Sequence, residues 1–206
     1  FIGIRPADNY KFIIITAPTS GIYSEPVRVK IESKYTRAVA GGVGFSKTAA
    51  NYAASLYPSV EAKKDGYDQL IWTDGIEHKY LEESGTMNLF FFIEDTIITP
   101  PLGDTVLDGV TRDSIICLAK YLNIKLEVRK ISIEEVISSI KNGSLKEAFG
   151  AGTAATVAPI KTIGYNSVDY NLPDINSKSY SSIFLGKLNN IKYGKEPDLF
   201  KWITKV

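Results

Sequence analysis

Few residues in this sequence could build a disulfide, a metal centre or a histidine-based site. Its 206 residues include one cysteine, Cys117, and one histidine, His78. A single cysteine excludes an intramolecular disulfide and favours a reducing compartment, so we expect a cytoplasmic protein. One cysteine and one histidine cannot form a zinc ligand set, so we expect no bound metal. No apolar run approaches about 18 residues, which excludes a transmembrane helix and predicts no membrane partner.

An excess of charge of one sign is also lacking. The chain has 24 basic and 23 acidic residues, which gives a formal net charge of +1. Proteins that bind nucleic acid generally carry a basic surface that neutralises phosphates, so we expect no nucleic-acid partner. With 44% hydrophobic and 23% charged residues, the composition is that of an ordinary globular domain.

The sequence does contain apolar patterns typical of both strands and helices. Apolar, β-branched runs predict strands at 12–16, 27–31, 68–72, 86–93, 97–98, 147–149 and 157–163. Apolar residues at helical spacing predict helices at 49–64, 111–121, 132–142 and 179–188. Pro58 should kink or end the first helix, whereas Ser132 and Gly143 fit the start and end of the third. We expect a loop at 166–176, and the mixture favours one α/β or α+β domain.

The first candidate for chemistry is Lys47, which follows a glycine-rich turn at 41–44 and precedes a predicted helix. A phosphate-binding P-loop requires glycine directly before its lysine, and Ser46 at that position argues against a P-loop. A lysine in a glycine-rich setting can instead form a Schiff base with a carbonyl group, as pyridoxal phosphate enzymes require. The alternative is an ordinary solvated surface lysine.

Three further segments contain residue types that such a cofactor needs. Glu83 stands beside a glycine turn and a strand, where a carboxylate could keep a pyridine nitrogen protonated. Residues 107–114 open a helix, whose free amides and dipole suit a phosphate group. Residues 149–154 combine small residues, free amides and a hydroxyl, which could hold a phosphate or a carboxylate. Each segment also has a plain structural interpretation: a surface turn, a helix capped by Asp108 or Thr111, and a tight strand-to-turn junction.

Together and in this order, these segments resemble the branched-chain amino acid aminotransferases, which are class IV, fold-type IV pyridoxal phosphate enzymes. The resemblance rests on Tyr35-Thr36-Arg37-Ala38, Gly41-Gly42-Val43-Gly44-Phe45-Ser46-Lys47, Asn51-Tyr52-Ala53, Glu83-Ser84-Gly85-Thr86-Met87-Asn88, Thr99-Pro100-Pro101-Leu102, Gly109-Val110-Thr111-Arg112 and Gly152-Thr153-Ala154. It extends over residues 1–206 and implies the family's large domain, a mixed sheet or pseudo-barrel with flanking helices.

The resemblance implies roles for four residues around the reactive part of the cofactor. Lys47 takes the place of the family's Schiff-base lysine, the catalytic residue that also moves the proton of the substrate Cα. Tyr52 matches a tyrosine that hydrogen-bonds the cofactor's phenolate oxygen and borders the substrate. Glu83 matches the carboxylate that faces the pyridinium nitrogen, and Thr86 matches a further hydrogen-bonding residue of the cofactor pocket.

Four more residues are implied at the phosphate and at the substrate. Val110 and Thr111 match backbone amides that hold the phosphate, and Thr153 matches a hydroxyl that does the same. The amides of Thr153 and Ala154 match the site of the substrate carboxylate.

The implied reaction is ping-pong transfer of an amino group from a branched-chain L-amino acid to 2-oxoglutarate, by a homodimer. The family has a small N-terminal domain before this unit, which supplies an arginine to the phosphate, and we expect it to be absent from residues 1–206. The alternatives are a D-amino-acid aminotransferase, an aminodeoxychorismate lyase, or an inactive domain fragment. The glycine-rich and Asn-Tyr strings favour the branched-chain group.

Overall fold

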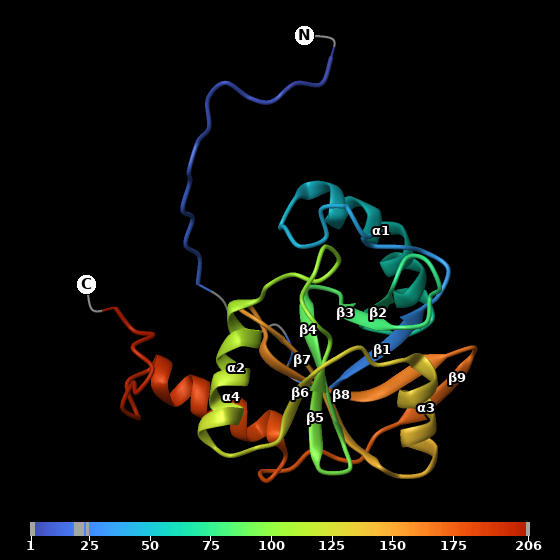
Figure 1. The fold of residues 1–206 in the computed structure, drawn as a ribbon, viewed down its shortest axis with the longest axis vertical. Coiled ribbons are helices and arrows are strands. Elements are labelled where there is room, and N and C mark those ends of the chain that lie inside the picture. Colours follow the sequence, from blue (N-terminus) through green and yellow to red (C-terminus); the bar gives the residue numbers. More distant parts are fainter. Residues whose placement is uncertain (1–2, 19–22, 24, 205–206) are drawn as a thin grey trace.

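The computed structural model describes residues 3–18, 23 and 25–204 (Figure 1). Its strands are β1 (Val27–Glu32), β2 (Gln69–Thr73), β3 (Leu81–Ser84), β4 (Met87–Ile93), β5 (Thr96–Thr99), β6 (Leu126–Val128), β7 (Leu145–Gly152), β8 (Thr156–Tyr165) and β9 (Val168–Asn171). Its helices are α1 (Ala49–Lys64), α2 (Val110–Tyr121), α3 (Ile133–Lys141) and α4 (Tyr180–Lys192). The ends of the resemblance, residues 1–2 and 205–206, lie outside the described residues.

Six of these strands close into a barrel. β3 pairs with β2 on one edge and with β4 on the other, and the ring continues through β1, β8 and β7. β1 runs parallel to both β2 and β8, whereas the other pairs in the ring are antiparallel. β5 and β6 extend the sheet beyond β4, and β9 forms a hairpin with β8. The expected mixed sheet with a pseudo-barrel and flanking helices is confirmed.

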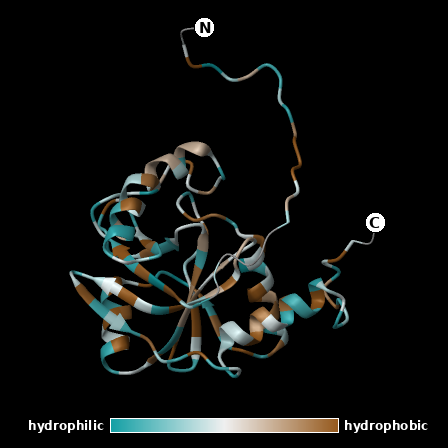
Figure 2. Cartoon of the chain, turned by 180° about the vertical axis from the view of Figure 1, so that it is seen from behind, coloured by the Kyte–Doolittle hydropathy of each residue, from teal (hydrophilic) through white to brown (hydrophobic). Residues whose placement is uncertain are grey.

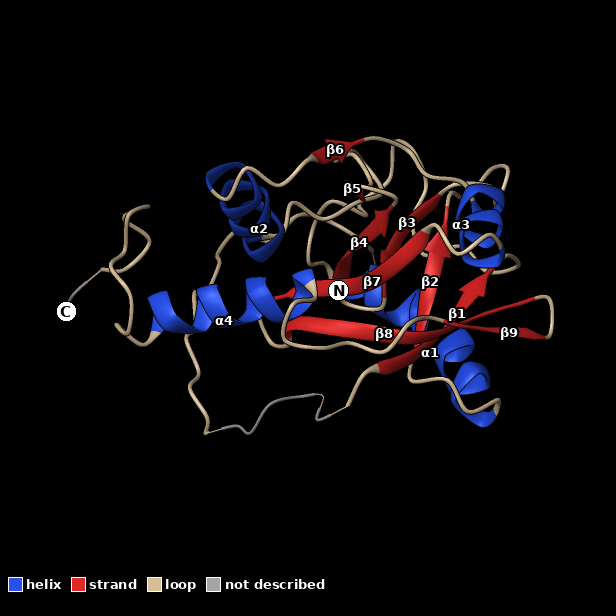
Figure 3. Ribbon diagram, turned by 90° about the horizontal axis from the view of Figure 1, so that it is seen from below, coloured by secondary structure: helices blue, strands red, loops and turns tan. Residues whose placement is uncertain are grey.

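The central strand β4 is apolar on both faces because each face meets a separate hydrophobic cluster. Leu89 and Phe91 belong to a cluster that includes residues of α3, whereas Phe90 belongs to one that includes residues of α2 and α4. Successive side chains of a strand point to opposite faces, which explains this alternation. Phe90 stacks on Phe149 of β7 with ring centroids 5.0 Å apart. In Figure 3, α2 and α4 lie on one side of the strands, and α1 and α3 lie on the other.

The four expected helices are confirmed to within a few residues at their ends. Ser132 caps α3 by accepting a hydrogen bond from the Glu135 amide at 3.0 Å, and Gly143 follows the helix with a φ of +76°. We expected Pro58 to kink or end its helix, and the prediction that the helix ends there is wrong. α1 continues past Pro58 to Lys64, and the proline ring is buried.

The strand expected at 12–16 is wrong. No strand pairs with this segment among the described residues, and the side chains of Phe12, Ile13, Ile14 and Ile15 are 70% to 91% exposed. Figure 2 shows this apolar stretch running away from the body of the fold. A strand requires a neighbour that pairs with its backbone amides and carbonyls, and sequence pattern alone does not supply one.

The loop expected at 166–176 is also wrong, because it contains β9. Asn166 and Ser167 have φ values of +49° and +62°, and they link β8 to β9. Positive φ at both central residues is the conformation of a type I′ hairpin turn. Most of β9 is exposed, so its sequence lacks the apolar alternation that would have predicted a strand.

Glu147 of β7 anchors the start of α4. Its carboxylate accepts hydrogen bonds from the backbone amides of Tyr180 at 2.8 Å and Ser181 at 2.7 Å. The carboxylate is almost fully buried, and Ser179, the residue before the helix, makes no side-chain cap. A carboxylate at a helix N-terminus satisfies free amides and interacts favourably with the helix dipole.

Glu147→Gln should therefore lower the free energy of unfolding by about 1–3 kcal/mol, because part of the new amide would present N–H groups to the same donors. Urea unfolding followed by circular dichroism measures the change. Glu127→Gln, at an exposed position on β6, is the matched control and should stay within about 0.5 kcal/mol of wild type. Equal losses in the two variants would contradict the anchoring role of Glu147.

Candidate active site

Lys47 and Tyr52 meet at the start of α1. Lys47 follows the turn that ends the glycine-rich segment, and Tyr52 lies in the first turn of the helix. The Lys47 Nζ donates a hydrogen bond to the Tyr52 hydroxyl at 3.4 Å, and both side chains are exposed. An accessible primary amine is therefore held beside a phenol.

Glu83 is a buried carboxylate near the end of β3, only 4% exposed. Its Oε2 forms an ion pair with the Arg37 guanidinium at 3.0 Å. Its Oε1 accepts hydrogen bonds from the Leu107 amide at 2.5 Å and from the Asn88 side chain at 3.4 Å. Glu83 thus joins three segments that are far apart in the sequence.

Burial raises the pKa of Glu83 to about 7, although the Arg37 charge and the Leu107 amide act in the opposite direction. The preceding residue, Glu82, points to the other face of the strand and accepts a hydrogen bond from the Thr105 hydroxyl at 2.6 Å. Burial raises the pKa of Glu82 as well. The segment before α2 is therefore held by two successive carboxylates.

The N-terminus of α2 presents backbone amides with no side-chain cap. Gly109 precedes the helix, so the plain structural alternative, a cap by Asp108 or Thr111, is wrong. Val110 is exposed and Thr111 is half-buried. A Cβ at Gly109 would lie 2.1 Å from the Asn88 Oδ1, so any larger residue here would force the Asn88 side chain to move. Free amides at a helix start form a site suited to an anion.

Two adjoining cavities bring seven of the eight expected site residues together. The first is lined by Arg37, Lys47, Tyr52, Glu83, Thr86, Asn88 and Leu107 among others. The second, of about 130 Å³, is lined by Lys47, Thr86, Asn88, Leu107, Val110, Thr111 and Thr153 among others. Lys47, Thr86, Asn88 and Leu107 line both cavities, so Lys47 borders the space lined by Glu83 and the space lined by the start of α2. Ala154 lines neither, although it follows Thr153 in the turn between β7 and β8.

Arg37 and Asn88 are site residues to which the sequence analysis assigned no role. One Arg37 Nη is shared between Glu83 and the backbone carbonyl of Thr105, and Asn88 donates to the carbonyl of Leu107 at 2.9 Å. Within the described part of the chain, the buried Nε of Arg37 has no hydrogen-bond partner. Both residues lie in the strings that carry the resemblance. Asn88 meets Glu83 across the β3–β4 hairpin, whereas no spacing rule predicts that Arg37 does.

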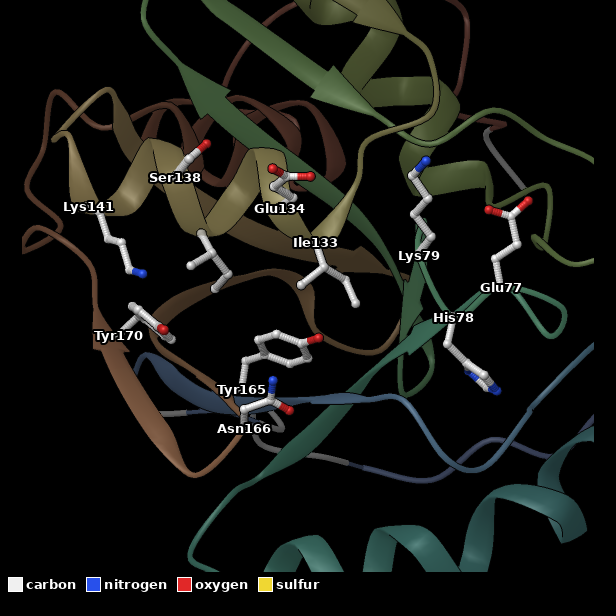
Figure 4. A pocket seen from close by; sticks show the side chains of 11 residues that line it. Glu77, His78, Lys79, Ile133, Glu134, Ser138, Lys141, Tyr165, Asn166 and Tyr170 are labelled. Carbon is white, nitrogen blue, oxygen red and sulfur yellow. The ribbon is translucent and has the colours of Figure 1, made fainter.

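Other features of the fold lie apart from this site. An open cavity of about 700 Å³ lies between α3, the turn before β3 and the β8–β9 hairpin, and none of the expected site residues lines it (Figure 4). The His78 ring lies 2.8 Å from the Thr73 hydroxyl, in a turn. Across the described ranges, histidine, cysteine and carboxylate side chains form no group of three that could hold a metal ion. In the same residues, every helix is too short or too polar to cross a membrane.

The raised pKa of Glu83 predicts a pH dependence of stability. Between about pH 4.5 and pH 7 the folded chain holds a proton on Glu83 that the unfolded chain has lost, so the free energy of unfolding falls as the pH rises. Glu83→Gln removes this titration, and urea unfolding should show the stability of wild type falling relative to the variant from about pH 5 to about pH 8. Parallel curves for the two proteins would contradict a perturbed Glu83.

Comparison with known proteins supports the resemblance. A family model described as amino-transferase class IV matches residues 3–163. Branched-chain-amino-acid aminotransferase 2 of Bacillus subtilis (strain 168) is 40% identical over 209 residues, which cover 100% of this chain and 58% of that protein. A probable branched-chain-amino-acid aminotransferase of Staphylococcus aureus (strain N315) is 46% identical over 168 residues, covering 80% of this chain and 47% of that protein. The chain thus spans less than two thirds of the length of these relatives.

Solved structures of such enzymes share the fold. The branched-chain aminotransferase from Thermoproteus uzoniensis, solved with norvaline, has a TM-score of 0.77 at 28% identity, over 91% of this chain and 59% of that chain. The branched-chain amino acid aminotransferase from Escherichia coli has a TM-score of 0.74 at 25% identity, over 87% and 57% of the two chains. Another branched-chain aminotransferase, at 26% identity and a TM-score of 0.73, was solved in complex with N-(5'-phosphopyridoxyl)-L-glutamate, over 87% of this chain and 56% of that chain. With its barrel, its lysine-centred site and these relatives, the chain belongs to the amino-transferase class IV family.

Proposed function

We propose that this chain is the cofactor-binding domain of a pyridoxal phosphate-dependent branched-chain amino acid aminotransferase. The observation that carries the proposal is the position of Lys47 between two adjoining cavities. One cavity ends at the buried carboxylate of Glu83, and the other ends at the uncapped start of α2. The named relatives, at 40% and 46% identity, support the branched-chain substrate.

The residues fit pyridoxal phosphate at three points. The Lys47 amine is accessible for bonding to an aldehyde. Glu83 offers a carboxylate to a pyridine nitrogen, and the amides of Val110 and Thr111 offer donors to a phosphate at a helix N-terminus. The Thr153 hydroxyl lines the same cavity as those amides, and Thr86 lines the space between the two ends.

When bound, pyridoxal phosphate supplies an aldehyde that exchanges amines and a conjugated ring that accepts an electron pair. Lys47 would hold it covalently through Nζ. Once released by an incoming amino acid, the same Nζ can take the proton from the substrate Cα and return it. The Tyr52 hydroxyl, 3.4 Å away, orients that nitrogen.

Glu83 sets the electrostatics at the far end of the site. Its pKa of about 7 leaves it readily protonated while Arg37 is the cation in contact with it. A second cation in contact, such as a protonated ring nitrogen, would favour the charged carboxylate and lower that pKa. Glu83 can therefore hold a proton on the ring nitrogen once the site is filled.

The substrate contacts belong to the turn between β7 and β8 and to Tyr52. Thr153 and Ala154 both lie in this turn, where backbone amides can meet a carboxylate. We place the substrate carboxylate there, beside Thr153 at the edge of the second cavity. Tyr52 borders the substrate from the first cavity.

Activity assays test this proposal. The protein should transfer the amino group of L-leucine to 2-oxoglutarate and should leave D-alanine largely unused, whereas a D-amino-acid aminotransferase would reverse this preference. Lys47→Ala should reduce the rate by at least about 10²-fold, because it removes the group that transfers the proton. Lys63→Ala, at the exposed end of α1, is the matched control and should retain wild-type activity.

Cofactor binding without turnover would favour the inactive-fragment alternative. Turnover that releases pyruvate and an aromatic amine from aminodeoxychorismate, with no transfer from leucine, would favour the lyase.

We also propose that the protein is a homodimer, with α1 and the glycine-rich segment at the interface. Apolar side chains on these elements are 47% to 65% exposed: Val39, Val43, Phe45, Leu56, Tyr57 and Val60. Several exposed apolar side chains on two successive segments are what a protein interface would cover. Tyr52 lies on the same helix, so the interface would adjoin the site.

Replacing both Leu56 and Val60 by Glu should dissociate the dimer into monomers, because it places charges in an apolar contact. Sedimentation velocity measures the change in mass. Val128→Glu, at a residue of β6 that is 50% exposed, is the control and should remain dimeric. A wild-type chain that sediments as a monomer at micromolar concentration would contradict the proposal.

Two further predictions of the sequence concern the whole chain. We propose that residues 1–206 form one large-domain unit, supported by the family model over residues 3–163 and by the single closed barrel. A cytoplasmic location remains a prediction based on the single cysteine, Cys117.

A further inference from the structure

The side chain of Asn51 ties the segment that carries Lys47 to α1. Asn51 is the third residue of the helix and is 7% exposed. Its Nδ2 donates one hydrogen bond to the carbonyl of Val43 at 2.6 Å and another to the carbonyl of Ser46 at 3.0 Å. Both amide hydrogens of the side chain are therefore used on the turn that precedes Lys47.

These bonds bear directly on the direction of the lysine side chain. The Ser46 carbonyl and the Lys47 nitrogen belong to one peptide group, which is planar and rigid. Holding that carbonyl fixes the plane from which the Lys47 Cα–Cβ bond emerges. Ser46 also bonds to the Val43 carbonyl through its amide and its hydroxyl, both at 3.0 Å, but these contacts stay within the turn.

The Asn51 side chain does not act as an ordinary helix cap. In a capping box, the third helical residue reaches back to the backbone amide of the residue before the helix. Here Thr48 makes no side-chain cap, and Asn51 donates to carbonyls further upstream. Because the next residue, Tyr52, contacts the Lys47 Nζ, the first turn of α1 holds the lysine at both its backbone and its amine.

We propose that Asn51 is a positioning residue that aims Lys47 at the cofactor. The proposal rests on the proposed binding of pyridoxal phosphate at Lys47. Asn51→Asp keeps the size of the side chain but replaces two donors by a carboxylate, which repels the carbonyls of Val43 and Ser46. The turn should then open and the lysine should lose its fixed direction.

The test is the rate at which pyridoxal phosphate, trapped with borohydride, labels Lys47 relative to Lys141 in the same peptide digest. Lys141 is an exposed lysine on α3, so it reports general accessibility. In wild type the ratio should favour Lys47, and in Asn51→Asp it should fall about tenfold or more, the scale on which misplaced reactive groups lose rate. Asn51→Ala, which adds no charge, should lower the ratio in the same direction and carries the test if the Asp variant does not fold.

Asn190→Asp is the matched control, because it removes an amide donor from the Glu196 carboxylate at the end of α4. It should lower the unfolding temperature without changing the labelling ratio. Asn51 variants that fold and keep the wild-type ratio would overturn the positioning role while leaving the cofactor site intact. A wild-type chain with no preference for Lys47 would instead overturn the proposed function, and this inference with it.

Discussion

The buried carboxylate of Glu83 is the group on which the arrangement of the site depends. A buried carboxyl group is tolerated only where its oxygens find polar partners, and Glu83 finds them in three separate segments. Arg37 comes from the stretch after β1, Leu107 from the segment before α2, and Asn88 from β4. Removing any one contact leaves a polar group buried without its partner, so these segments are held in place together.

Closure of the barrel explains how such distant segments meet. β3 is short, yet it pairs with β2 and β4 at once. The β3–β4 hairpin sets Glu83 opposite Asn88, and the pairing with β2 joins this hairpin to the rest of the barrel. Glu82 and Glu83, being adjacent in a strand, face opposite ways, and each binds the segment that leads into α2. That segment leads into the start of α2, which lines the same cavity as Lys47. Glu83 thus lies on a strand of the barrel, whereas the other expected site residues lie in loops and turns and at helix starts.

Local contacts of the site could be predicted from the sequence, whereas contacts across the fold could not. Lys47 and Tyr52 are five residues apart at the start of a helix, so their contact follows from local geometry. The ion pair between Arg37 and Glu83 depends on how the barrel closes, and no local pattern contains that information. The family strings named eight site residues, and seven of them line the two adjoining cavities, but the strings gave Arg37 and Asn88 no role.

The errors in the predicted fold have the same physical origin. Residues 12–16 have the composition of a strand, but a strand forms only where a neighbour offers paired backbone groups. β9 has a polar, exposed sequence and exists because β8 supplies that neighbour through a two-residue turn at Asn166 and Ser167. Composition therefore predicted a strand at 12–16 that does not form and missed β9, which does. Backbone pairing, rather than burial, decides the structure in both places.

The central claim is that the amine of Lys47, unlike those of the other lysines, forms a specific covalent bond with pyridoxal phosphate because of where the fold places it. Titration of the chain with pyridoxal phosphate, followed by borohydride reduction and peptide mapping, tests this claim most directly. The account predicts saturable binding and a single pyridoxyl group, on Lys47. Label distributed over exposed lysines such as Lys63 and Lys141, with no saturable phase, would contradict it.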